Sequence, residues 1–156
     1  MNTGLSNCPE ERMPTVLNFV DYCAKELMPR QRRKILVYID FEENLFDTEG
    51  ILGDCDFDSS MQPPDWYDIR VDRSLSNDDL LLTLAHELVH IKQYARRELK
   101  QLMRSPYYRF RKEYFHNSTP YAERPWEIEA YELESELVEN FLTSANQFAT
   151  LHTPIN

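Results

Sequence analysis

The amino-acid sequence predicts an α+β fold, in which a small twisted sheet packs on two long helices. Two short strand-like runs, ILVYIDF at residues 35–41 and WYDIRVD at residues 66–72, precede two long stretches of helical character. Strands that come before helices, without regular alternation of the two, are typical of α+β domains. A chain of 156 residues suits one domain, residues 1–156, and is long enough to bury a core.

The N-terminal half is expected to supply one helix and both strands. Residues 1–13 look like a loosely ordered lead-in, and a helix should follow from Pro14 to Met28, where Pro29 ends the pattern. One apolar stripe recurs there with helical spacing at Leu17, Val20, Ala24 and Leu27. The two strand-like runs are rich in β-branched and aromatic residues, and the acidic residues 42–64 between them should form a loop.

The main helix is expected from Ser76 to about residue 104. Ser76 is a good N-cap, and Asp79 three residues later completes a capping-box pattern. Pro106 helps to stop this helix, and the run YYRFRKEYF that follows alternates enough to form a strand or a hairpin arm. Its tyrosines, Tyr107, Tyr108 and Tyr114, favour a strand that packs on a helix, with a peptide-binding wall as the alternative.

A last helix is predicted from Pro125 to about residue 147, because proline suits the first helical turn. The apolar spacing assigns its buried stripe to Trp126, Ala130, Leu133, Leu137 and Phe141. Glu132, Glu136 and Glu139 then fall on the solvent side. Glu127 and Glu134 fall on one flank of the stripe and Glu129 on the other, so all three carboxylates are candidates to meet the main helix.

The composition argues against several classes of function. Lys and Arg total 17 and Asp and Glu total 27, a formal net charge of −10, which argues against nonspecific binding to nucleic acid or anionic membranes. No apolar run approaches the roughly 20 residues of a membrane span, and the N-terminus lacks a signal-peptide pattern. Three widely spaced cysteines, Cys8, Cys23 and Cys55, are typical of reduced thiols, so we expect a cytoplasmic protein.

The motif that carries chemistry is HELVH, from His86 to His90. Two histidines four residues apart lie on one helix face and can direct two imidazoles at one zinc ion. Glu87 lies about 100° round the helix from His86, where its carboxylate can reach a zinc-bound water without binding the metal. Zinc lowers the pKa of that water toward about 7, so Glu87 is the candidate general base for hydrolysis.

The helix around this motif is apolar on almost every side and should be buried. Its apolar members are Leu80, Leu81, Leu82, Leu84, Ala85, Leu88, Val89 and Ile91. Two histidines and a glutamate in such a helix need polar partners, because an unpaired buried polar group costs free energy. A metal ion would supply those partners at once, which favours a metal site over an ordinary stretch of helix.

A catalytic zinc normally takes three protein ligands, so one ligand should lie outside the motif. The candidates are His116, in the turn-like segment EYFHNSTP, and the three carboxylates that flank the last helix's buried stripe. His152 lies four residues from the end of the sequence, where we expect an exposed side chain. The residue pattern alone leaves Glu127, Glu129, Glu134 and His116 open as the third ligand.

The segments TLAHELVHIKQYARREL and RPWEIEAYELE together resemble the small gluzincin metallopeptidases, particularly phage-type SprT-like and ImmA/IrrE-like proteins. In that group the ligand glutamate lies three residues before an alanine, so the resemblance selects Glu127, three residues before Ala130. It covers about residues 75–141 and implies a zincin-like fold, a Zn²⁺ cofactor and a peptide or protein substrate. Tyr131 stands where related families often have Asp or Asn. The chain also lacks the cysteine zinc ribbon that many SprT proteins carry, which argues against DNA–protein crosslink repair.

We therefore expect a zinc metalloendopeptidase in which His86, His90 and Glu127 bind Zn²⁺ and Glu87 acts on the zinc-bound water. Tyr131, four residues after Glu127 on the same helix face, is a candidate for stabilising the oxyanion. Other candidates for that role are His116, Tyr121 and Arg124. The strand WYDIRVD is expected to align an extended substrate by β-augmentation. The alternative is a zinc-containing regulatory or binding protein of the same fold.

Overall fold

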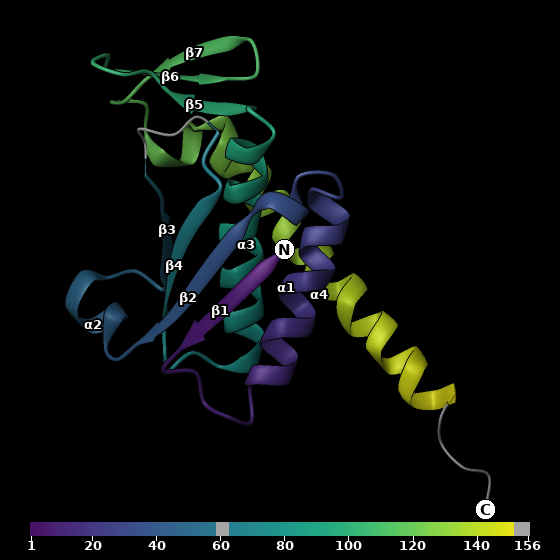
Figure 1. Ribbon diagram of the computed structural model, residues 1–156. Helices are drawn as coiled ribbons and strands as arrows, with labels where there is room; N and C mark the ends of the chain where they lie inside the picture. The colour runs from purple at the N-terminus through teal and green to yellow at the C-terminus, as the bar shows by residue number, and fades with distance from the viewer. Residues whose placement is uncertain (59–62, 152–156) are drawn as a thin grey trace, which may run out of the picture.

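The computed structural model describes residues 1–58 and 63–151, and its elements are shown in Figure 1. Four α-helices and two small sheets make up the described chain, so the predicted α+β class is confirmed. Two short 3₁₀ helices, Arg32–Lys34 and Tyr121–Glu123, complete the elements. His152, for which exposure is expected from the sequence, lies outside the described residues.

The larger sheet has the strand order β1-β2-β4-β3. Both predicted strands are present, as β2 (Leu36–Glu42) and β4 (Trp66–Asp72), and they pair in parallel. β1 (Asn2–Ser6) pairs in parallel with β2, whereas β3 (Gly53–Asp56) runs antiparallel to β4 and forms the opposite edge. Strand β4 is therefore paired on both sides, and β3 is not.

Two segments that the sequence predicts to be irregular are ordered elements. The prediction of a loose lead-in is wrong for Asn2–Ser6, which forms β1, and the predicted acidic loop contains α2 (Leu45–Glu49) and β3. Short polar strands of this kind carry little signal of their own, because the backbone of a neighbouring strand supplies their hydrogen bonds. At Gly4 a Cβ atom would lie only 2.8 Å from the ring of Tyr38, so a larger residue there would force that ring to shift.

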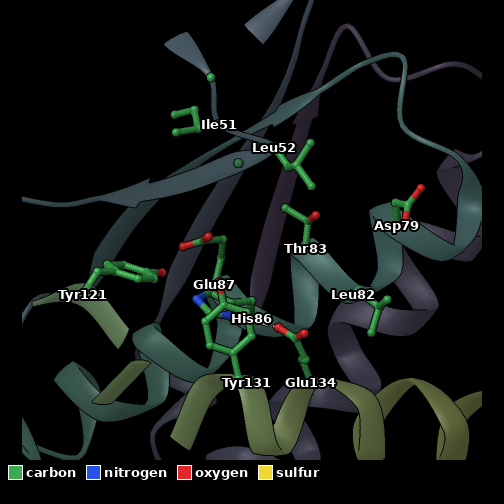
Figure 2. Close-up of a pocket in the computed structure, with 12 residues that line it drawn as sticks. Ile51, Leu52, Asp79, Leu82, Thr83, His86, Glu87, Tyr121, Tyr131 and Glu134 are labelled. Atoms are coloured by element: carbon green, nitrogen blue, oxygen red, sulfur yellow. Dashed lines mark hydrogen bonds and ion pairs between the residues drawn. The ribbon is translucent and has the colours of Figure 1, made fainter. Parts of the chain in front are cut away.

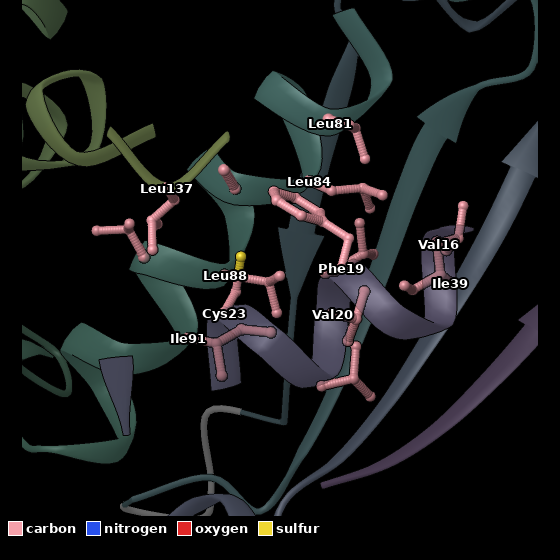
Figure 3. Close-up of a cluster of buried hydrophobic side chains, with 14 of the residues drawn as sticks. Val16, Phe19, Val20, Cys23, Ile39, Leu81, Leu84, Leu88, Ile91 and Leu137 are labelled. Atoms are coloured by element: carbon pink, nitrogen blue, oxygen red, sulfur yellow. The ribbon is translucent and has the colours of Figure 1, made fainter. Parts of the chain in front are cut away.

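Helices α1 (Met13–Leu27) and α3 (Asn77–Ala95) bury their apolar faces against one side of this sheet (Figure 3). The sheet contributes alternate residues to this core, namely Val37, Ile39, Phe41, Tyr67, Ile69 and Val71. The stripe predicted for α1 is buried at Val20, Ala24 and Leu27 but not at Leu17, which is 39% exposed. Val16 and Phe19 are fully buried instead, so the buried face is rotated from the predicted one.

Helix α3 begins as predicted and ends earlier. The backbone N–H of Asp79 donates to the Ser76 hydroxyl at 3.1 Å, which confirms the predicted cap. The helix stops at Ala95 and not near residue 104, because Arg97 takes a left-handed φ of 60° and reverses the chain. Leu99 is then buried in a second, small core with Phe110 and Trp126, which favours a strand over further helix.

A second sheet follows α3, with β5 (Leu99–Gln101), β6 (Tyr107–Phe110) and β7 (Glu113–His116) in that order. Helix α4 (Pro125–Leu151) then packs along α3, as Figure 1 shows. Trp126, Ala130 and Leu137 of its predicted stripe are buried. None of the helices in the described part of the chain combines the length and apolar character that a membrane span requires.

Candidate metal centre

Helices α3 and α4 bring His86, His90 and Glu127 together. The Nε2 atoms of His86 and His90 lie 3.4 Å and 3.3 Å from the Oε2 atom of Glu127. The ligand atoms of the three residues all lie within 4.8 Å of one another, and His86 and Glu127 are buried. This group could hold a metal ion, with two nitrogen donors and one carboxylate oxygen.

The two helices are joined next to this group by Gln93, a fully buried polar residue. Its side-chain N–H donates to the carbonyl of Trp126 at 2.9 Å and to the Glu129 carboxylate at 2.8 Å. These bonds attach the first turn of α4, which carries Glu127, to the helical turn that follows His90. The sequence pattern did not single out Gln93, although a glutamine three residues after His90 in a largely apolar helix is a signal for such a contact.

The Oε2 atom of Glu127 is a buried polar atom that accepts no hydrogen bond from the described residues. Such an atom costs free energy unless a cation or donor satisfies it. Two ligands bound tetrahedrally at 2.0–2.1 Å from one zinc ion lie about 3.3–3.4 Å apart. The separations from Glu127 to the two histidines agree with that value, so the three residues fit a divalent metal.

The other ring nitrogens of the two histidines are held by acceptors. The Nδ1 of His86 lies 2.8 Å from the Glu134 carboxylate, and that of His90 lies 3.0 Å from the amide oxygen of Gln93. Because both acceptors need a donor, each Nδ1 carries a proton, so a neutral imidazole at either position has its lone pair at Nε2, where a metal would bind. Oriented imidazoles of this kind are usual for histidines that bind a metal.

Burial and charge oppose each other within the group. Burial acts to raise the pKa of Glu127, but the two imidazoles beside its carboxylate outweigh burial and hold that pKa well below its ordinary value. Burial acts to lower the pKa of both histidines, and the neighbouring carboxylates outweigh it in turn. The Glu127 carboxylate is therefore ionised and available as a ligand at neutral pH.

Glu87 lies beside the group and is not one of its three donors. Figure 2 shows that it lines a cleft together with His86, Thr83 and Tyr121. The cleft has a volume of about 470 Å³ and runs along α3 below residues 50–53. Burial raises the pKa of the Glu87 carboxyl, and the nearby histidines oppose this only in part. A carboxylate of raised basicity that faces an open cleft next to the donors can accept a proton there.

The structure separates the other candidates for the third ligand. Glu134 contacts Nδ1 of His86, the ring nitrogen on the other side from the one that faces Glu127. Glu129 forms ion pairs with Lys92 at 2.9 Å and Arg111 at 2.7 Å. His116 is exposed on β7, where its ring bonds the Ser118 hydroxyl at 2.7 Å. Neither Glu129 nor His116 joins the group formed by His86, His90 and Glu127.

Two of the proposed oxyanion-stabilising residues line the cleft. The ring of Tyr131 contacts the ring of His86, with 4.8 Å between centroids. The ring centroids of Tyr121 and Tyr131 lie 6.5 Å apart. Burial and a hydrogen bond to Glu127 raise the pKa of Tyr121, so its hydroxyl keeps its proton. Arg124 instead donates to the carbonyl of Thr119 at 3.0 Å and is absent from the residues that line the cleft.

The expectation that WYDIRVD aligns a substrate is wrong. That segment is β4, whose backbone is already paired with β2 on one side and with β3 on the other. A strand that is paired on both sides has no free backbone groups for a further strand. The edge strand β3 begins at Gly53, which together with Leu52 lines the cleft.

Comparisons of the chain with protein-family models, with curated proteins and with solved structures found no match. The described residues form a buried His86, His90 and Glu127 group on two packed helices, with an HExxH-like spacing on α3 and an open cleft beside it.

Proposed function

We propose that this protein is a zinc-dependent metallopeptidase of the HExxH-plus-glutamate kind. The observation that carries the proposal is the buried Oε2 of Glu127, which accepts no hydrogen bond from the described residues and faces the Nε2 atoms of His86 and His90. Glu87, next to these donors and facing the cleft, supplies the base that hydrolysis needs. The resemblance of α3 and α4 to the gluzincin peptidases supports the same assignment.

Zinc suits this donor set better than the harder cations do. Two neutral imidazoles and one carboxylate match zinc, whereas magnesium and calcium prefer oxygen ligands throughout. Three protein ligands are the usual number at a catalytic zinc and leave a coordination position open. When bound, zinc polarises a carbonyl group and lowers the pKa of a coordinated water.

The chain's own residues would handle the protons. Glu87 would accept a proton from the attacking water and deliver it to the leaving amine, and its buried position keeps its basicity raised. Glu134 and Gln93 would hold the two imidazoles in the tautomer that leaves each Nε2 free. The hydroxyl of Tyr131 or Tyr121 would donate a hydrogen bond to the oxyanion.

A peptide or protein substrate would lie in extended form between α3 and the edge strand β3. Among the described residues no strand pairs with the outer edge of β3, so its backbone groups can bond a further strand. The cleft of about 470 Å³ below it would hold side chains of that strand close to Glu87 and His86.

The test compares the zinc-loaded wild type with Glu87→Gln on a panel of unstructured proteins, with new termini identified by mass spectrometry. Gln keeps the shape of the side chain but removes its basic oxygen, so cleavage should slow by about 10²–10⁴-fold. Zinc content, measured by elemental analysis, should stay unchanged because Glu87 is not a ligand.

Equal cleavage by both proteins would assign the activity to another residue or to a contaminant. Intact substrates after incubation with the zinc-loaded wild type would favour the alternative, a zinc-containing regulatory or binding protein. A wild type that folds and shows no affinity for zinc would refute both.

A further inference from the structure

The second sheet has two chemically different faces. In the antiparallel register Leu99 lies opposite Phe110, and Tyr108 lies opposite Phe115. These four side chains point to one face and pack around Trp126 of α4, with ring centroids between 5.3 Å and 6.2 Å from the indole for the three aromatic residues. This inner face accounts for the small second core, and Figure 1 shows the sheet at one end of the molecule.

The outer face carries cations and aromatic rings. Arg109 lies opposite Lys100 on one side and opposite Tyr114 on the other. Tyr107 lies opposite His116, and their rings are 5.2 Å apart. Tyr107 is 44% exposed and Tyr114 is 64% exposed, so the face is open to solvent. The exposed rings and the cations on the neighbouring strands therefore share one face of the sheet.

Positive charge is concentrated around this sheet. Seven of the 17 Lys and Arg residues lie between residues 96 and 112, with one acidic residue, Glu98, which gives a local net charge of +6. Glu98 is already bound by Lys92 and Arg96, at 2.7 Å and 3.0 Å. Five of these cations form no ion pair with any residue that the structure describes: Arg97, Lys100, Arg104, Arg109 and Lys112.

Three arginines occupy backbone positions that disfavour arginine. Arg97, Arg104 and Arg111 have φ values of 60°, 57° and 55°, and all three lie in turns of this sheet. The other non-glycine residues with positive φ in the described chain are both asparagines, which tolerate this region better.

The ion pair of Arg111 with Glu129, at 2.7 Å, gives a structural reason for an arginine at that turn. Arg97 and Arg104 have no such partner among the described residues, although asparagine or glycine would cost less in either turn. Backbone strain of this kind tends to cluster at functional sites. The guanidinium groups of Arg97 and Arg104 are therefore available to a group outside the chain.

We propose that the outer face of β5-β6-β7 binds single-stranded nucleic acid. Tyr107, Tyr114 and His116 would stack on unpaired bases, and the cations of the strands and turns would contact phosphates. Strands of three or four residues span about 10–13 Å, enough for roughly two or three nucleotides. This site is separate from the proposed peptidase function and does not depend on it.

The charge and the rings together decide between possible partners. A duplex hides its base faces, so it would leave the tyrosines unused, and an acidic peptide would use the cations alone. The net charge of −10 opposes binding over the surface as a whole, but screening over about 10 Å at 0.1 M salt limits its effect on one sheet. Single strands use both features, and their affinity should fall steeply with salt.

The experiment measures fluorescence anisotropy of a labelled oligothymidylate and an oligouridylate, each about 15 nucleotides long, with the full chain at about 50 mM salt and above. Tyr114→Ala should weaken binding roughly tenfold, and Tyr114→Phe, which keeps the ring, should bind like wild type. Arg104→Asn should weaken binding and reduce the salt dependence by about one phosphate contact. Its melting temperature should stay level or rise, because asparagine accepts the left-handed turn.

The matched control is Arg33→Asn, which removes the same charge from an exposed residue of the other basic cluster, RQRRK. It should leave binding unchanged. No binding at about 50 mM salt, or equal losses in Arg33→Asn and Arg104→Asn, would overturn the proposal. So would binding that Tyr114→Ala leaves intact and that an oligoglutamate peptide competes for, because the partner would then be an acidic protein.

Discussion

The carboxylate of Glu127 decides what the candidate centre can do. A glutamate at this position could have formed hydrogen bonds or faced water, yet its Oε2 is buried between two imidazole nitrogens. The carboxylate is the only acidic member of the three-donor group, and Glu134 and Gln93 orient the other two. At the scale of single residues, substitutions of Glu127 and of Glu134 should distinguish a residue that binds the metal from one that orients a ligand.

Replacing Glu127 by Ala should lower zinc affinity by more than about 100-fold. Loss of a residue that only orients a ligand costs up to about 100-fold, and loss of a ligand should cost more. The physical reason is the loss of one of the three donors, the only carboxylate among them. Competition with a chromophoric chelator measures the change. Glu132→Ala, on the exposed side of α4, is the control and should bind zinc as wild type does. Loss of zinc in His116→Ala but not in Glu127→Ala would move the site elsewhere.

Replacing Glu134 by Ala should lower zinc affinity by about 10–100-fold. The His86 imidazole would lose the acceptor 2.8 Å from its Nδ1 and with it both its fixed tautomer and part of its basicity. The same chelator competition applies, and Glu136→Ala, an exposed glutamate two residues further on, is the matched control. A Glu134→Ala protein with unchanged affinity would show that the contact does not support the metal.

At the scale of elements, the approach of β3 to α3 forms the roof of the cleft. At Gly53 a Cβ atom would lie 2.6 Å from the Thr83 side chain and 2.9 Å from the Arg70 carbonyl. Gly53→Ala should therefore push the edge strand away and destabilise the fold by about 1–3 kcal/mol, the usual range for overpacking. Denaturant unfolding measures this. Gly53→Ala combined with Thr83→Ser should recover part of the loss, and no recovery would contradict the assigned contact.

Asp72 joins the end of β4 to α2 and should make stability depend on pH. It accepts the backbone N–H groups of Phe46 at 2.7 Å and Ser74 at 2.8 Å, and these bonds hold its pKa below the ordinary value. A lowered pKa contributes stability that is full above the unfolded pKa of about 3.9 and is lost as pH falls through the folded pKa.

Unfolding free energies of wild type and Asp72→Asn, measured from neutral to acid pH, test this. The difference between them should shrink below about pH 4. Asp78→Asn, an exposed residue in the first turn of α3, is the control and should follow wild type. A difference that stays constant through the acid range would show that the charge of Asp72 makes no contribution.

At the scale of the whole molecule, the acidic surface should select among substrates of the proposed peptidase. The cleft is lined by Asp79, Glu87 and Glu134, within a chain of net charge −10. Extended segments rich in Lys and Arg should be cleaved faster than acidic ones, and the rates should fall as salt rises. Cleavage of matched basic and acidic peptides at two salt concentrations measures this, and equal rates at both would contradict it.

The local pattern of the sequence was sufficient to predict the elements whose apolar side chains repeat with a regular period. β2, β4 and the start of α3 at Ser76 follow from periodicity and capping, as does the common face of His86 and His90. The helical spacing of α4 also predicts that Glu127, Glu129 and Glu134 flank its buried stripe, which makes these three carboxylates candidates for the third ligand. These features depend on residues within a few positions of one another, and a sequence records such neighbours directly.

Tertiary structure alone decided the features that need distant partners. β1 exists because β2 lies beside it, and α3 ends early because Leu99 finds a core that includes Trp126. The crossing of α3 and α4 chose among the carboxylates, placing Glu127 at the two histidines and Glu134 behind one of them. Periodicity shows which face of an element is buried. What that face meets depends on contacts between residues that lie tens of positions apart, and only the folded chain determines them.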